Sequence, residues 1–71
     1  MAKRFNARDW VEHEVEDLMD LYGGTRAEQL EFVHDQLVAD EYRDELLDSQ
    51  AFKAAVAAQT LLQMERKAGA K

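Results

Sequence analysis

Apolar residues recur at helical spacing over the first third of the chain. The residues that share one arc of about 80° on a helical wheel are Ala7, Val11, Val15, Leu18 and Tyr22. The opposite face of this segment is mostly acidic. Asn6 is a suitable N-cap, and Gly23 and Gly24 follow the last apolar position, where glycine takes the left-handed C′ conformation without strain. The pattern therefore predicts a helix over residues 7–22 with one face in a core.

A second helix is predicted over residues 26–39. Thr25 and Glu28 have the spacing of a capping box, in which two side chains accept hydrogen bonds from backbone N–H groups at the start of a helix. The apolar stripe that follows consists of Leu30, Val33 and Leu37. Because only a short glycine turn separates the two predicted helices, we expect an antiparallel N-terminal helical hairpin.

The apolar pattern changes direction near residue 39. Tyr42 and Leu46 lie about 120° to 160° around the wheel from Leu30, so a straight helix could not bury both sets against one neighbour. We predict a break at residues 39–41 and a short third helix over residues 41–47. The alternative is one long helix, clamped between two partners, with a second apolar face formed by Phe32, Ala39, Tyr42 and Leu46.

A last helix is predicted over residues 50–67, capped by Asp48 or Ser49. Its apolar arc covers more than half of the circumference, which is more than one neighbouring hairpin can bury. We therefore expect this helix either to lie at the centre of the bundle or to carry a dimer interface. The candidate interface residues are Phe32, Tyr42, Ala51, Ala54, Ala58 and Leu61.

The expected fold class is all-α, a small three- or four-helix bundle built on the N-terminal hairpin. Seventy-one residues, 46% of them apolar, suffice for one small folded domain, so residues 1–71 are assigned to a single helical domain with frayed ends at 1–5 and 68–71. No apolar run approaches the length of about 20 residues that spans a bilayer, and the first residues lack the apolar core of a signal peptide. We expect a cytoplasmic protein that does not bind membranes.

Charge is distributed unevenly along the chain. The net charge is −6, but residues 9–48 hold fourteen acids and two bases, a net of −12, and each end carries +3. A domain that binds duplex nucleic acid usually presents a basic stripe, so we do not expect direct nucleic-acid binding. The carboxylates assigned to partner binding are Asp9, Glu12, Glu16 and Asp20 on the first helix, and Asp40, Glu41, Asp44 and Glu45 further along.

These features predict a non-enzymatic interaction module. A strong negative field attracts basic proteins and speeds their encounter, so the expected role is a regulator, inhibitor or accessory subunit on a basic protein partner, with mimicry of nucleic-acid phosphates as one form of it. The protein is expected to be a homodimer. No arrangement of nucleophile and base is evident, so catalysis is not expected, and we assign no cofactor.

Two other functions stay open at this point. Glu31 and His34 form an E-x-x-H unit, whose members share one helix face, and a homodimer could hold a metal with two such units and Glu14 from each copy. A chain with fifteen acids produces this spacing easily by chance, so the main interpretation includes no metal. The remaining alternative is a small structural component of a larger assembly, such as a phage particle.

Overall fold

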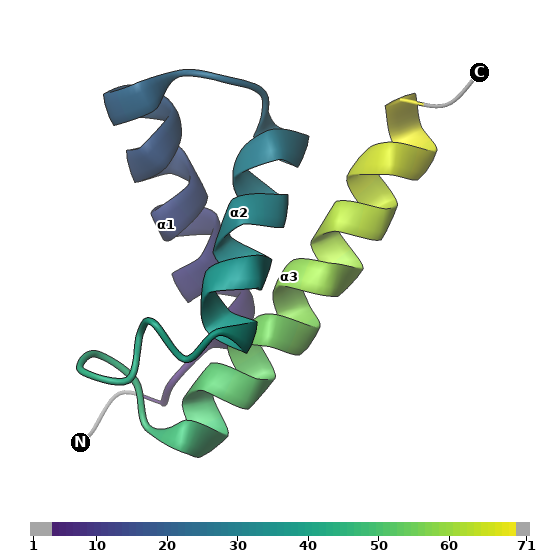
Figure 1. The fold of residues 1–71 in the computed structure, drawn as a ribbon. Helices are drawn as coiled ribbons and strands as arrows, with labels where there is room; N and C mark the ends of the chain where they lie inside the picture. The colour runs from purple at the N-terminus through teal and green to yellow at the C-terminus, as the bar shows by residue number, and fades with distance from the viewer. Residues whose placement is uncertain (1–3, 70–71) are drawn as a thin grey trace.

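A computed structural model describes residues 4–69 and contains three helices within them. In chain order these are α1 (Ala7–Tyr22), α2 (Arg26–Val38) and α3 (Asp48–Gly69), and residues 4–69 include no strand. Helices α1 and α2 lie side by side, and α3 packs against both of them, more extensively against α2 (Figure 1). The all-α prediction is confirmed. Residues 1–3 and 70–71, which belong to the ends predicted to fray, lie outside the described residues, whereas residues 68 and 69 are helical.

The predicted caps fix the ends of the first two helices. The Asn6 side chain accepts a hydrogen bond of 3.0 Å from the backbone N–H of Asp9, which confirms the N-cap of α1. Gly23 and Gly24 have φ angles of 78° and 84°, so both occupy the region that favours glycine. Helix α1 therefore ends at Tyr22, and α2 packs against it.

The capping box at the start of α2 is complete. The backbone N–H of Glu28 donates to Thr25 Oγ1 at 3.1 Å, and the backbone N–H of Thr25 donates to Glu28 Oε1 at 2.9 Å. The hydrogen bond from the Thr25 backbone N–H, assisted by the Thr25 side chain, lowers the pKa of the Glu28 carboxyl. Two donors that no helical carbonyl can reach are thereby satisfied, and α2 begins at the predicted residue.

The predicted short helix over residues 41–47 is wrong, and so is the alternative of one continuous helix. Helix α2 ends at Val38 in a Schellman motif: the N–H of Asp40 donates to Leu37 O at 3.1 Å, and the N–H of Glu41 donates to Gln36 O at 2.9 Å. Asp40 has a φ of 62°, a left-handed conformation that turns the chain away from the helix axis. Residues 39–47, here called the connecting segment, consist of turns and an irregular end.

Helix α3 is longer than predicted at both ends. It begins at Asp48, two residues early, and the side chain that bonds at its start is Gln50, which accepts a hydrogen bond of 2.9 Å from the backbone N–H of Leu47. The predicted cap at Asp48 or Ser49 is therefore wrong, because both residues are already within the helix. At the other end Arg66 and Lys67 favour the helix C-terminus through the macrodipole.

The core lies where the three helices meet. Its members are Val11 and Val15 from α1, Leu30, Val33 and Leu37 from α2, Leu46 from the connecting segment, and Ala51, Ala54, Ala58, Leu61 and Leu62 from α3. Tyr22, which the helical wheel placed on the apolar stripe of the first helix, is 76% exposed. It is the last residue of α1, so nothing in the next turn of that helix covers it.

Helix α3 is central, and four of the six predicted interface residues lie in the core of their own chain. Ala51, Ala54, Ala58 and Leu61 are buried in the core, although Ala51 also borders a groove between α2 and α3. Small side chains here serve close packing against α2 instead. The large apolar side chains that α3 exposes are different ones, namely Phe52, Val56 and Met64.

Candidate functional site

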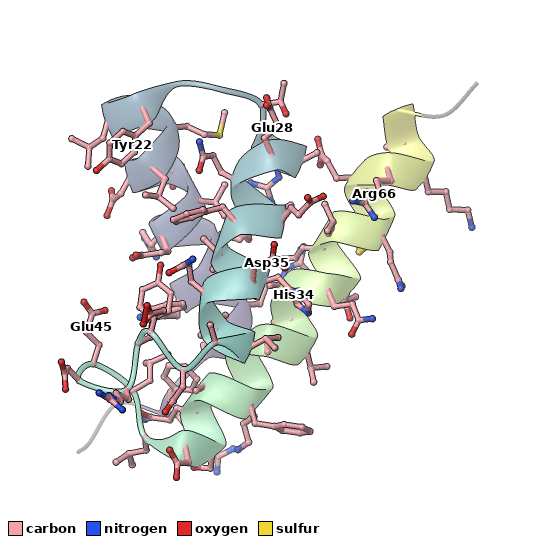
Figure 2. All side chains as sticks on the ribbon, viewed as in Figure 1. Tyr22, Glu28, His34, Asp35, Glu45 and Arg66 are labelled. Carbon is pink, nitrogen blue, oxygen red and sulfur yellow. The ribbon has the colours of Figure 1, made fainter. Side chains whose placement is uncertain are left out.

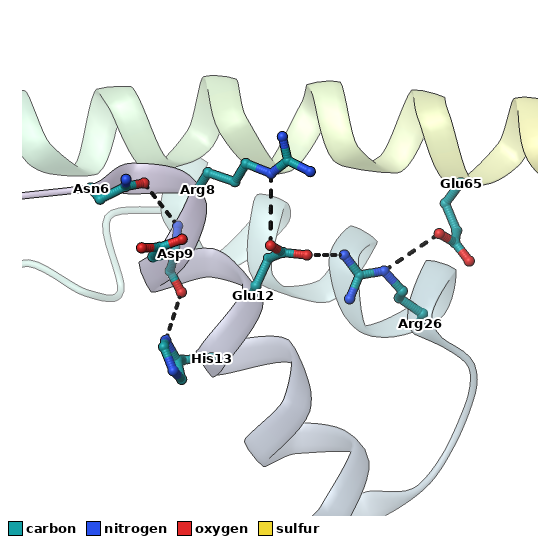
Figure 3. Close-up of polar contacts among 7 residues, drawn as sticks. All are labelled: Asn6, Arg8, Asp9, Glu12, His13, Arg26 and Glu65. Carbon is teal, nitrogen blue, oxygen red and sulfur yellow. Dashed lines mark hydrogen bonds and ion pairs between the residues drawn. The ribbon is translucent and has the colours of Figure 1, made fainter.

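The acidic row predicted on α1 is only partly free. Asp9, Glu16 and Asp20 are exposed, as the sequence suggested. Glu12 is half-buried, and its carboxylate forms ion pairs with Arg26 at 2.5 Å and with Arg8 at 3.7 Å (Figure 3). Glu12 therefore links α1 to α2, and its role in partner binding stays a prediction.

Arg26 joins all three helices. It extends from the start of α2, pairs with Glu12 of α1, and approaches Glu65 of α3 with an Nε–Oε2 distance of 3.4 Å (Figure 3). Arg66 of α3 forms a second link, to Glu31 of α2 at 2.6 Å. Sequence reasoning missed both contacts, although Arg26 is one of only two bases in the acidic residues 9–48, which was a signal that it has a carboxylate partner.

The acidic cluster of the connecting segment is exposed. Asp40, Glu41, Asp44 and Glu45 all lie at the surface, and no ion pair among residues 4–69 joins any of them to a base. One base, Arg43, lies within the same segment, so the local charge stays strongly negative. Carboxylates without a basic partner maintain a negative field in the surrounding water.

Tyr42 anchors this cluster to α1. Its hydroxyl donates a hydrogen bond of 3.0 Å to Glu14 Oε2, and its ring meets the Trp10 ring edge-on, with centroids 4.9 Å apart and an interplanar angle of 89°. Aromatic pairs prefer such edge-to-face contacts. The connecting segment therefore has a defined position on α1, although it is not helical.

We expect Tyr42 to ionise only in strong base. Burial raises the pKa of its hydroxyl above the ordinary value of 10.0, and the hydrogen bond to Glu14 and the negative charges of Glu14 and Glu45 raise it further. Because the pKa of Tyr42 is raised in the folded state, the neutral hydroxyl contributes to stability in full below pH 10.0. This contribution is lost as the pH rises towards the pKa that Tyr42 has in the folded protein.

The chain has two tyrosines, so a Tyr22→Phe variant retains only Tyr42. Titration of this variant, followed by tyrosinate absorbance, measures the ionisation of Tyr42 alone. The midpoint should lie above 10.0 and should coincide with the onset of alkaline unfolding followed by circular dichroism. A midpoint at or below that value would show that Tyr42 is not held against Glu14.

A groove of about 560 Å³ runs between α1 and α2. Its lining residues are Leu18, Tyr22, Gln29, Phe32, Gln36, Glu41 and Tyr42. Phe32 and Tyr42, two of the predicted interface residues, both belong to it, and Phe32 is 47% exposed. Its one charged lining residue is the acidic Glu41. This groove, called the α1/α2 groove below, brings the connecting segment and an open apolar surface together.

A second groove, of about 530 Å³, lies between the C-terminal end of α2 and the N-terminal half of α3. Its lining residues are His34, Leu37, Val38, Asp40, Asp48, Ala51, Phe52, Ala55, Val56 and Gln59. Three of these are large apolar side chains with substantial exposure: Val38 at 68%, Phe52 at 72% and Val56 at 47%. The sequence placed Phe52 and Val56 on the apolar arc of the last helix, but only the structure shows that they stay uncovered. It is called the α2/α3 groove below.

The three residues considered for a metal site do not come together. The Glu14 carboxylate accepts a hydrogen bond from the Tyr42 hydroxyl, while Glu31 and His34 line a small hollow between α2 and α3. Arg66 lines the same hollow, and Figure 2 labels it together with His34. The nearest acidic atom to the His34 ring is Asp35 Oδ1, 3.5 Å from Nδ1. Among residues 4–69 no cluster of three or more His, Cys, Asp or Glu side chains could hold a metal ion.

Two further findings concern membrane spans and similarity to other proteins. No helix within residues 4–69 is both long enough and apolar enough to cross a membrane. No family model, curated protein or solved structure matches this chain.

Proposed function

We propose that this chain is a non-enzymatic, acidic interaction module that docks on a basic segment of a protein partner. The observation that carries the proposal is that a carboxylate of the exposed acidic cluster lines an open apolar groove. Glu41 lines the α1/α2 groove, and the negative charges of Glu14 and Glu45 act on Tyr42 in the same wall.

The charge pattern favours a basic partner. The arginines of the three helices pair with Glu12, Glu31 and Glu65, which leaves the acids of the connecting segment and the outer face of α1 exposed. Such a surface steers a cationic protein towards it before contact and repels anionic competitors. Phosphate mimicry is one form that this attraction can take.

The apolar groove supplies binding affinity that charge alone does not provide. Exposed ion pairs contribute little affinity, about 0–1 kcal/mol each, whereas burial of aromatic side chains in a groove contributes most of the binding energy in many complexes. Phe32 and Tyr42 are the aromatic groups available here. The occupant that fits both features is an amphipathic helix, with an apolar stripe for the groove and lysine or arginine facing the connecting segment.

The test is capture of partners from a lysate of the source organism, followed by titration of the identified partner. Trp10, the one tryptophan, contacts Tyr42 and reports binding by fluorescence. We expect a basic partner that is retained at low salt and released at high salt. The triple variant Glu41→Gln/Asp44→Asn/Glu45→Gln should weaken binding at least tenfold.

A matched variant tests whether binding depends on the charges of the connecting segment or on the net charge of the whole chain. Glu16→Gln/Asp17→Asn/Asp20→Asn removes the same number of charges from α1, and it should weaken binding far less than the triple variant of the connecting segment. Phe32→Ser leaves the charge unchanged and should also weaken binding. The proposal would be contradicted if the amount of partner captured did not change with salt concentration or in any of the three variants.

A further inference from the structure

We infer that a second copy of this chain covers the α2/α3 groove, so that the protein self-associates through Val38, Phe52 and Val56. The inference does not depend on the proposed function, because it rests on the opposite side of α2. These three apolar side chains surround a single groove, although an isolated chain of this size gains stability by covering such groups. The interface differs from the one that the sequence suggested, whose α3 residues are buried.

Charge indicates that the occupant is a second copy. Over residues 50–67 the chain has three bases, Lys53, Arg66 and Lys67, against one acid, Glu65, which faces Arg26. The rest of the surface is dominated by the net charge of −12 over residues 9–48. Two copies of a protein with a net charge of −6 therefore meet with the least repulsion across α3.

The same face also offers complementary charges. Asp40 and Asp48 line the α2/α3 groove, and Lys53 follows Phe52 on α3. When two α3 helices pack antiparallel, the acidic start of each lies towards the basic end of the other, where Lys67 is located. Lys67 of one copy then approaches Asp48 of its partner, and the two charges offset each other.

The shape of the surface suits a two-fold contact. A symmetric dimer uses the same patch on both copies, so the patch must contain both a protruding group and a space to receive one. Phe52 is 72% exposed at the side of a groove lined by Leu37, Val38 and Ala55. Each Phe52 can therefore enter the groove of the other copy. The dimer would leave both α1/α2 grooves open, because these are lined from the other side of α2 by Phe32 and Gln36.

Sedimentation and light scattering over a concentration series test the inference with the intact chain. We expect a mass near twice 8.2 kDa at the higher concentrations. Phe52→Ser/Val56→Ser should raise the dimer dissociation constant at least tenfold, while circular dichroism stays helical because both side chains are outside the core. Phe32→Ser, the matched change in the other groove, should leave the dimer intact.

Cysteine crosslinking provides a second measurement, since the native chain has no cysteine. Gln59→Cys, in the α2/α3 groove, should form a covalent dimer on oxidation, whereas Asp20→Cys on the outer face of α1 should not. A monomer at every concentration would overturn the inference. A dimer that tolerates Phe52→Ser/Val56→Ser but is broken by Phe32→Ser would also overturn it, and would assign self-association to the α1/α2 groove.

Discussion

Replacing Leu30 with alanine is expected to lower the free energy of unfolding by about 2–5 kcal/mol. Leu30 is fully buried at the centre of the three-helix core, so the shorter side chain leaves a cavity that the surrounding residues cannot fill completely. A domain of 71 residues has a total stability of about 4–10 kcal/mol. The variant should therefore lose between a fifth and all of its stability.

Urea unfolding followed by circular dichroism measures this loss, at one fixed protein concentration because self-association contributes to apparent stability. Leu21→Ala is the matched control: Leu21 is 74% exposed, and its replacement should change stability by less than about 0.5 kcal/mol. Equal effects at the two positions would show that the core is not where the structure places it.

Enlarging Ala58 to leucine should have the second largest effect, a loss of about 1–3 kcal/mol. Ala58 is fully buried in α3, so leucine there must fit three more carbon atoms into the packed core. The added side chain would push α3 away from its neighbours or take a strained rotamer. The same substitution at Ala68, which is exposed near the end of α3, should be nearly neutral.

Thermal and urea midpoints of Ala58→Leu and Ala68→Leu provide the comparison. If Ala58 instead served as an open dimer contact, as the sequence alone suggested, leucine there would leave the isolated chain as stable as the wild type and would change only its self-association. This pair of variants therefore tests the central position of α3 independently of the dimer.

Local signals in the sequence accounted for the first two helices and their caps. Asn6, the glycine pair and the Thr25–Glu28 box act through hydrogen bonds or backbone conformations within a few residues, so their effects were predictable without the rest of the fold. The stripe of Leu30, Val33 and Leu37 was equally reliable, since its period follows from helix geometry.

The connecting segment was predicted less well, because its conformation depends on a left-handed residue that is not glycine. Asp40 has a φ of 62°, which aspartate tolerates better than most residues, but the sequence carries no strong sign of this. Once the Schellman motif turns the chain, Leu46 enters the core and Tyr42 meets Glu14 and Trp10. These contacts join residues far apart in the chain.

The candidate surfaces also combine features that the sequence predicts with features that depend on tertiary packing. The sequence by itself determined the three main helical segments, where the first two begin, and where the acids are concentrated, because propensity, capping and charge are properties of neighbouring residues. Only the tertiary structure decided that Ala51, Ala54 and Ala58 face inward, that Glu12 pairs with Arg26, and that Phe32 and Phe52 lie exposed in two separate grooves. A wide apolar arc can be covered in several ways, and the side that is covered depends on how the other helices pack.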